Sequence, residues 1–259
     1  MITLTSPNHQ IIAKVFPEFG SRLGSLVINE QHILLTGDGD DDPLSWGCYP
    51  MVPFAGRLRH GKLHFNNATH QLRLNRQPHS IHGTVFDQIW DIKQQTSSSI
   101  TLETNFGIHW PFQGSVLHHI DVTDHRIHFE LAVTAHETMP VQVGWHPWFI
   151  KPQNSSLRFE SMLLRDHQGI TTTQEVESPQ SPVDDCFIRP QSDVTLTVKE
   201  QRLTLTSDCS HWVIFDKPEN ATCIEPQSGP PNASNDSPFV LIAGETFHRW
   251  FDIEVVRET

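Results

Sequence analysis

The stretch VTLTVKEQRLTLTS, residues 194–207, carries an apolar side chain at every second position on both sides of a polar centre. The apolar positions are Val194, Leu196, Val198, Leu203 and Leu205. Because successive side chains of a β-strand point to opposite faces of the sheet, this alternation is typical of strands with one buried and one exposed face. The polar residues 199–202, KEQR, lie between the two alternating runs and predict a hairpin turn.

The same period of two recurs along the chain. It is present in ITLET (residues 100–104), RIHFELAV (126–133) and FHRWFDIEVV (247–256). Turn-forming pairs such as Asn66-Asn67 and Thr123-Asp124 punctuate the sequence between such runs. No long stretch has the period of an α-helix, and we expect at most short helical turns near Ala55–Leu58 and Leu163–His167.

These patterns predict an all-β chain of many antiparallel strands. Large antiparallel sets that do not close into a barrel pack as two face-to-face sheets, so we expect a large antiparallel β-sandwich. The length of 259 residues suits a single domain over residues 1–259. Two polar stretches, residues 174–186 and 225–238, interrupt the alternation and are expected to be irregular, the first as a surface loop that leads to a site.

The charge balance bears on the possible partners. The chain has 18 basic and 30 acidic residues, a formal net charge of −12. Nucleic acids and anionic membranes are bound through Lys and Arg that neutralise phosphates, so we expect neither as a partner. No signal peptide and no apolar run of membrane-spanning length is visible.

The cysteines and the absence of a signal bear on the compartment. The chain has four widely spaced cysteines and no C-x-x-C pair: Cys48, Cys186, Cys209 and Cys223. This usage favours reduced, buried thiols in a cytoplasmic protein.

Ionisable residues next to rigid turns are the candidates for chemistry. They are Arg57 in PFAGRLRHGKLHF (53–65), His82 in HSIHGTVFDQIWDI (79–92), and His146 in VGWHPWFI (143–150). To these we add Glu225, which follows the apolar residues TCI and precedes a proline. A carboxyl group in that place is expected to be partly desolvated, which raises its pKa toward values useful for proton transfer.

Tryptophan accompanies these residues, as Trp148 lies two positions after His146. Indole faces pack against the C–H faces of sugars, while polar side chains bind the hydroxyl groups. The combination of His, Glu, Asp, Arg and Trp therefore favours a carbohydrate site. The sequence has no G-x-G-x-x-G, no Walker lysine loop and no H-E-x-x-H, which argues against redox, phosphoryl-transfer and zinc-protease chemistry.

Five segments, in order, resemble the motifs of the aldose 1-epimerase family of galactose mutarotase-like proteins. They are FAGRLRHGKLHF, HSIHGTVFDQIWDI, GWHPWF, VDDCF and IEPQSGPPNA, and they span roughly residues 50 to 235. The resemblance implies the family fold, a large antiparallel supersandwich with an open cleft. It also implies the family reaction, which interconverts the α and β anomers of an aldose without a metal or other cofactor.

The resemblance further implies roles for individual residues. His146 corresponds to the general acid and Glu225 to the general base, and both are expected to change protonation near neutral pH, with the pKa of His146 near its ordinary value. Arg57 and His82 correspond to ligands of the substrate hydroxyls and of the region near the ring oxygen.

Two further positions are assigned to sugar binding. Asp184 corresponds to a hydroxyl ligand, with Asp185 as the neighbouring alternative. Trp148 stands where a tyrosine is common in the family. The only partner expected is a small sugar substrate, bound by a monomer or a homodimer.

Three alternatives remain open. The pair His79-x-x-His82 could hold Zn or Mn together with another ligand. The fold could serve as a non-catalytic sugar-binding module. Finally, a group of five basic residues forms either a solvated hairpin face or a clamp for the phosphate of a hexose 6-phosphate; it consists of Arg57, Arg59, Lys62, Arg73 and Arg76.

Overall fold

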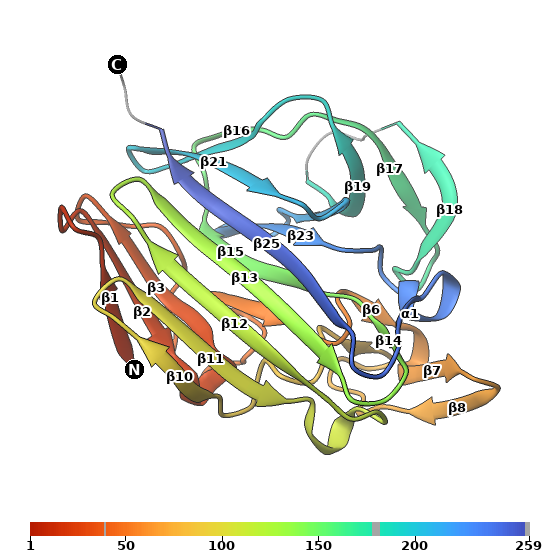
Figure 1. Ribbon diagram of the computed structural model, residues 1–259. Coiled ribbons are helices and arrows are strands. Elements are labelled where there is room, and N and C mark those ends of the chain that lie inside the picture. Colours follow the sequence, from red (N-terminus) through yellow and green to blue (C-terminus); the bar gives the residue numbers. More distant parts are fainter. Residues whose placement is uncertain (39, 178–181, 257–259) are drawn as a thin grey trace.

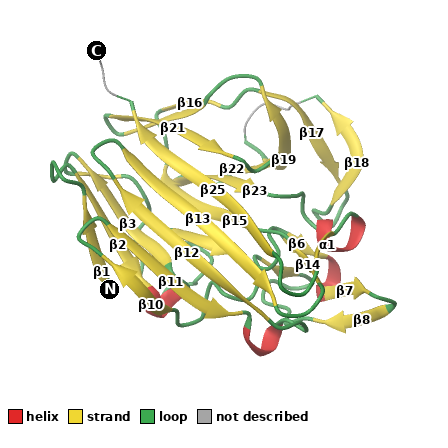
Figure 2. Ribbon diagram, viewed as in Figure 1, coloured by secondary structure: helices red, strands yellow, loops and turns green. Residues whose placement is uncertain are grey.

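The alternating stretch at residues 194–207 forms the predicted hairpin. Strand β20 (Val194–Val198) pairs antiparallel with β21 (Gln201–Ser207), and Lys199 and Glu200 make the turn between them. The computed structural model describes residues 1–38, 40–177 and 182–256. Within these ranges nearly all regular structure is β-strand, arranged as two large sheets that pack face to face (Figures 1 and 2).

The first sheet contains eleven strands in the described ranges, and its neighbouring strands are antiparallel. Its order is β1 (Ile2–Thr5), β2 (Ile11–Phe16), β3 (Arg22–Ile28), β5 (Cys48–Met51), β15 (Gly144–Ile150), β23 (Ala221–Gln227), β22 (His211–Phe215), β19 (Asp184–Pro190), β17 (Phe159–Arg165) and β18 (Thr171–Val176), with β4 (Gln31–His32) also paired to β3.

The second sheet contains eight strands in the same ranges, with β13 and β25 at its centre (Figure 1). Its order is β10 (Asp91–Gln95), β11 (Ser99–Asn105), β12 (Gly114–Val122), β13 (Arg126–Ala135), β25 (Thr246–Val255), β21, β20 and β16 (Asn154–Ser156). The predicted fold class, an all-β antiparallel sandwich, is therefore confirmed.

Short elements surround the sheets. Three two-stranded pairs are β6 (Arg57–Leu58) with β9 (Ser80–Ile81), β7 (Lys62–Phe65) with β8 (Ala68–Gln71), and β14 (Met139–Val141) with β24 (Phe239–Leu241). The helical elements are η1 (Pro17–Phe19), η2 (Arg59–Gly61), η3 (Gly107–His109) and α1 (Ala233–Asp236). None of the helices in the described part of the chain is long and apolar enough to cross a membrane.

The main core lies between the two sheets. Alternate residues of β15, including Trp145, point into it and meet Phe251 of the opposite sheet, with ring centroids 5.9 Å apart. The buried side of β13 contributes Phe129 and Leu131, both with 0% exposure. All four cysteines lie in the described ranges and are buried, free thiols, as expected.

The two expected helical turns had different outcomes. Near Ala55–Leu58 a short helical turn is present, because η2 (Arg59–Gly61) follows directly. The expectation at Leu163–His167 was wrong, because residues 163–165 belong to β17. Arg57 pairs with Ile81 in β6–β9, and Leu163 pairs with Cys186 in β17–β19.

The two stretches expected to be irregular are partly strand. Residues 174–176 end β18 and residues 184–186 begin β19, while residues 178–181 of the same stretch lie outside the described residues. Residues 225–227 complete β23, and α1 follows within the second stretch. Both stretches therefore deliver polar residues to the large sheet rather than to a separate loop.

The alternation of β13 makes a testable prediction about the core. Leu131→Ala should lower the free energy of unfolding by roughly 2–5 kcal/mol, because the lost methyl groups leave a cavity between the sheets. Leu117→Ala on the neighbouring β12, whose side chain is 37% exposed, is the matched control and should change it by less than about 1 kcal/mol. Urea unfolding of both variants is the measurement. If the two substitutions lower the free energy of unfolding equally, the assignment of Leu131 to the buried face and Leu117 to the exposed face is contradicted.

Candidate functional site

The candidate site lies on the face of the eleven-stranded sheet that points away from the core. Its first part is a row of cross-strand neighbours on β3, β5, β15 and β23: Arg22, Tyr49, His146 and Glu225. Tyr49 lies directly opposite His146, and Arg22 and Tyr49 flank the pairing position of β3 with β5. Directly opposed residues point to the same face, so these four side chains stand side by side.

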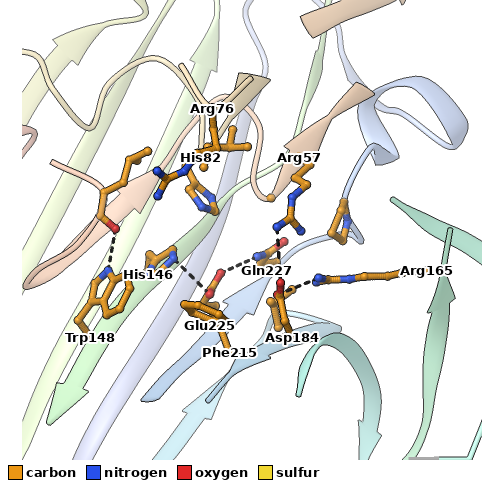
Figure 3. A pocket seen from close by; sticks show the side chains of 15 residues that line it. Arg57, Arg76, His82, His146, Trp148, Arg165, Asp184, Phe215, Glu225 and Gln227 are labelled. Carbon is orange, nitrogen blue, oxygen red and sulfur yellow. Dashed lines mark hydrogen bonds and ion pairs between the residues drawn. The ribbon is translucent and has the colours of Figure 1, made fainter. Parts of the chain in front are cut away.

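A second row runs parallel to the first, two residues further along the strands. Trp148 of β15 lies opposite Cys223 of β23, which lies opposite Phe215 of β22. Phe215 in turn lies opposite Asp184 of β19, and Arg165 of β17 bonds to that carboxylate. Six residues of these rows line a pocket, seen from close by in Figure 3: His146, Glu225, Trp148, Phe215, Asp184 and Arg165. Arg22, Tyr49 and Cys223 are buried beneath it.

Segments that precede β10 form the opposite wall of this pocket. The β6–β9 pair carries Arg57 beside Ile81, and the chain continues from there to His82. Arg76 reaches the pocket from the loop before β9 and lies beside His82 in Figure 3. The structure therefore brings the six sequence-predicted residues into one pocket: Arg57, His82, His146, Trp148, Asp184 and Glu225.

The centre of the site is the contact between His146 and Glu225. The Nε2 atom of His146 lies 3.3 Å from Oε1 of Glu225, and the two residues are only 5% and 2% exposed. Gln227, two residues further along β23, donates from Nε2 to the other carboxyl oxygen of Glu225 at 3.1 Å. An imidazole and a carboxyl group thus lie in contact at the wall of the pocket.

The surroundings shift both groups toward their neutral forms. Burial, reinforced by the negative charge of Asp184, raises the pKa of Glu225 to about 8. Burial, reinforced by the positive charge of Arg22, lowers the pKa of His146 to about 3. At neutral pH the pair therefore holds one proton, which resides on Glu225. The expectation that His146 keeps an ordinary pKa was wrong, because burial of the imidazole disfavours its cationic form.

A buried arginine lies behind this pair. Arg22 is 0% exposed, and its guanidinium carbon lies 4.6 Å from the ring centroid of Tyr49. Its amino groups donate to the main-chain carbonyls of Trp46 and Pro43. Tyr49 stacks on His146 with centroids 4.9 Å apart and an interplanar angle of 17°. The tyrosine ring thus separates a fixed positive charge from the imidazole, and this charge disfavours protonation of His146.

Asp184 is held ionised by two arginines. Its Oδ1 atom accepts from Nη1 of Arg165 at 2.8 Å, and its Oδ2 atom lies 3.5 Å from Nη2 of Arg57. Burial alone would raise the pKa of Asp184, but the two guanidiniums outweigh it and leave the pKa below its ordinary value. Asp185 lies 3.9 Å from Nε of Arg165, and Asp184 is the one of the two that lines the pocket.

His82 is positioned by a strained turn. Its φ angle is +60°, in the left-handed region, and its main-chain N–H donates to Gly56. Gly83 follows at φ +80°, where an added Cβ would lie 2.0 Å from the carbonyl oxygen of Val52, so only glycine fits there. The turn presents the imidazole of His82 edge-on to His146, with centroids 4.8 Å apart.

The protonation state of His82 suits a hydrogen-bonding role. Burial, reinforced by neighbouring positive charges, holds the pKa of His82 well below its ordinary value, so the ring is neutral at pH 7. The side chain of His82 lines the pocket. A neutral imidazole carries one donor and one acceptor nitrogen, so it can donate to or accept from a sugar hydroxyl.

Trp148 forms an aromatic wall of the pocket. Its indole N–H donates to the carbonyl of Leu44 at 2.9 Å, which fixes the ring. The indole stacks near His146, with centroids 5.3 Å apart, and meets the edge of Phe215 at 6.0 Å. Because its polar hydrogen is already engaged, the side chain can contribute only apolar surface to a ligand.

The five basic residues of the proposed phosphate clamp do not act together. Arg59 pairs with Asp166 at 2.6 Å and Arg73 with Asp87 at 2.6 Å, while Lys62 lies exposed on β7. Of the five, Arg57 and Arg76 line the pocket.

The geometry also bears on the His79-x-x-His82 metal pair. The main-chain N–H of His60 donates to Nδ1 of His79 at 3.1 Å, and Nε2 of His79 lies 3.1 Å from the carbonyl oxygen of Gln168. Both ring nitrogens of His79 are therefore engaged away from His82, and neither is free to bind a metal beside it.

Several residues in or beside the pocket were not found from the sequence. Arg165 was missed because its segment was interpreted as a helical turn, and residues 159–165, FESMLLR, show no regular alternation that would indicate a strand. Gln227 shares a strand face with Glu225 and could have been inferred from that spacing. Arg22 and Tyr49 carry no local signal, since their place beside His146 depends on the register of β3, β5 and β15.

Two curated proteins resemble the chain in sequence. Among curated proteins, the chain is 27% identical to the uncharacterized protein YphB of Escherichia coli K12 over 111 residues, which cover 41% of this chain and 38% of that protein. It is 23% identical to the uncharacterized protein YihR of the same organism over 270 residues, which cover 90% of this chain and 87% of that protein.

The fold is shared with solved structures. A galactose 1-epimerase from Lactobacillus acidophilus NCFM superposes with a TM-score of 0.83 over 98% of this chain and 93% of that chain, at 16% sequence identity. At that identity the likeness shows the fold alone. The family model described as aldose 1-epimerase, however, matches residues 1–253. This match over nearly the whole sequence, which confirms the resemblance found in the motifs, shows that the chain belongs to the aldose 1-epimerase family.

Proposed function

We propose that this protein is an aldose 1-epimerase, which interconverts the α and β anomers of an aldose by proton transfer through Glu225 and His146. The observation that carries the proposal is the 3.3 Å contact between Oε1 of Glu225 and Nε2 of His146 at the wall of a pocket. Ring opening needs one group that takes the proton of the C1 hydroxyl and one that protonates the ring oxygen.

The proton count of the pair fits this reaction. When the ring opens, Glu225 accepts the proton of the C1 hydroxyl and His146 gives a proton to the ring oxygen, so the pair neither gains nor loses protons. The C1–C2 bond of the open aldehyde then rotates, and the two transfers run in reverse on the other face of C1. One shared proton on the pair therefore suffices for a full cycle.

The shifted pKa values favour the open-chain state. Opening begins from the carboxylate and the imidazolium and ends with the neutral carboxyl and the neutral imidazole. The buried site favours that neutral form, as the raised pKa of Glu225 and the lowered pKa of His146 indicate. The starting form is reached when a proton moves from Glu225 to His146 across their 3.3 Å contact. Cleavage of the bond between C1 and the ring oxygen then neutralises the carboxylate of Glu225 and the imidazolium of His146. The low polarity of the buried site favours this loss of charge.

The remaining pocket residues would hold the sugar. Asp184 and Arg57 offer an acceptor and a donor for hydroxyl groups, and His82 offers a neutral imidazole beside His146. Trp148 offers an apolar face for the C–H groups of the ring. Binding alone would not require a buried acid and base in contact, which argues against a non-catalytic sugar-binding module.

A phosphorylated substrate is the second candidate, because of Arg76. Its side chain is 59% exposed at the pocket, and the closest carboxylate oxygen, Oδ2 of Asp42, lies 3.8 Å away. Arg57 and Arg165 are already paired with Asp184. A single exposed guanidinium is a weak anchor for a phosphate, so we favour a neutral aldose, with galactose and glucose as the first substrates to test.

Removal of either proton-transfer group should abolish most of the activity. We expect Glu225→Gln and His146→Ala each to slow anomer exchange by at least ~10²-fold, as is typical for a positioned acid or base. The measurement is the rate of mutarotation of freshly dissolved α-galactose and α-glucose, by polarimetry or by NMR exchange. Glu175→Gln on the exposed edge of β18 is the matched control. Wild-type rates in the Glu225→Gln variant would contradict the proposal.

The role of Arg76 can be separated from that of the reacting pair. For a neutral-aldose enzyme, Arg76→Ala should change kcat/KM for galactose or glucose by no more than a few-fold, since an exposed guanidinium contributes little to binding a neutral ligand. The same assay with glucose 6-phosphate should show no preference for the phosphorylated sugar in the wild type. A strong preference that Arg76→Ala removes, and that Arg73→Ala retains, would favour the phosphorylated substrate instead.

The pKa of Glu225 predicts a pH-dependent stability difference. Because folding raises this pKa from 4.5 to about 8, the stability that Glu225 contributes is complete below pH 4.5 and is lost as the pH rises toward 8. Glu225→Gln does not titrate, so the melting temperature of the variant relative to the wild type should rise between pH 5 and pH 9. Thermal unfolding of both proteins across this pH range is the measurement. If the melting temperature of the variant relative to the wild type falls as the pH rises, the pKa of Glu225 is not raised.

A further inference from the structure

The catalytic pair has a third potential metal ligand beside it. The ligand atoms of His146, Cys223 and Glu225 all lie within 4.8 Å of one another, and all three residues are buried. No other group of three such side chains occurs in the part of the chain that the structure describes. We propose that these three residues form an inhibitory binding site for a zinc-like divalent cation.

The register of the large sheet explains how the three residues meet. Cys223 and Glu225 are two residues apart on β23, so their side chains project from the same face. Cys223 lies opposite Trp148 of β15, and His146 lies two residues before Trp148 on the same face of that strand. The cluster therefore belongs to two central strands of the sheet and does not depend on a loop conformation.

The geometry is close to that of a tetrahedral zinc site. Ligand atoms on one zinc ion lie about 3.5 Å apart, given zinc–nitrogen, zinc–oxygen and zinc–sulfur bonds of about 2.0–2.3 Å. Nε2 of His146 and Oε1 of Glu225 are already 3.3 Å apart. The sulfur lies within 4.8 Å of both other ligand atoms, so it has to approach each of them by at most about 1.3 Å, which rotations of the side chains supply. His146 and Glu225 line the pocket, which gives the fourth ligand position access to water or a sugar hydroxyl.

The chemistry of the ligands selects the ion. Thiolate, imidazole and carboxylate together suit zinc and its softer analogue cadmium, whereas magnesium prefers oxygen ligands only. Binding releases the proton of the Cys223 thiol and the proton of the Glu225 carboxyl, while neutral His146 contributes a lone pair. The divalent ion with one thiolate and one carboxylate has no net charge, so the occupied site avoids an uncompensated charge in a buried place.

A bound ion would block the proposed reaction. Occupancy would engage both proton-transfer groups at once. The inhibitory effect rests on the proposed epimerase function, but metal binding itself does not.

Cadmium provides a readout that needs no activity. Titration of the full-length wild type with CdCl2 should produce one equivalent of ultraviolet thiolate-to-cadmium charge-transfer absorption. Cys223→Ser should lose this band, because it removes the only thiolate of the site. Cys209→Ser, at another buried free thiol, is the matched control and should retain the band. An unchanged band in Cys223→Ser, or no band in the wild type, would overturn the proposed site.

Inhibition is measured in parallel with ZnCl2 in the anomer-exchange assay. Wild-type activity should fall with zinc, recover with a chelator and be insensitive to MgCl2. Cys223→Ser should keep its basal rate and need at least ~10-fold more zinc for the same inhibition. Equal zinc sensitivity of the two proteins would show that zinc acts elsewhere and would overturn an inhibitory role for this site. A Cys223-dependent cadmium band in a protein without epimerase activity would leave the metal site standing and reject the proposed function.

Discussion

The contact between Glu225 and His146 is the interaction on which the site depends. The two residues are far apart in the sequence, and they meet because β15 and β23 are neighbours at the centre of the large sheet. Burial makes the charged forms of both groups unfavourable, so both are neutral at pH 7 and the pair holds one proton. Burial therefore accounts for the raised pKa of Glu225 and the lowered pKa of His146.

The two-sheet architecture explains how such a polar pair can be kept in place. Alternate residues of β15 serve opposite purposes: Trp145 and Phe149 fill the core, while His146 and Trp148 face the pocket. The apolar side chains hold the strand against the core. Because successive side chains of a strand point to opposite faces, the polar side chains between them then face the pocket. A rigid sheet floor then positions the reacting groups, and the segments that carry Arg57 and His82 supply the opposite wall. Sites built on regular elements in this way hold their geometry well.

Each ionisable group of the pocket has its own neighbouring charges, which determine its protonation state. Arg57 and Arg165 keep Asp184 ionised, and the negative Asp184 helps to keep Glu225 protonated. Arg22, on the far side of Tyr49, helps to keep His146 neutral. Two carboxyl groups in one pocket thus hold different protonation states, because one has guanidinium partners and the other is buried beside an imidazole. Such separation of pKa values is typical of sites that carry out acid–base chemistry.

The sequence by itself determined the strands, the sandwich and most of the candidate site. Period-two alternation specifies which face of each strand is buried, and the five ordered motifs identified Arg57, His82, His146, Asp184 and Glu225. Tertiary structure alone decided which strands are neighbours and in which register. It therefore decided that Arg22 stands behind Tyr49, that Arg59 and Arg73 pair away from the pocket, and that His146 is too deeply buried to keep an ordinary pKa. The physical reason is that alternation is a local property, whereas cross-strand contacts and desolvation depend on residues far away in the chain.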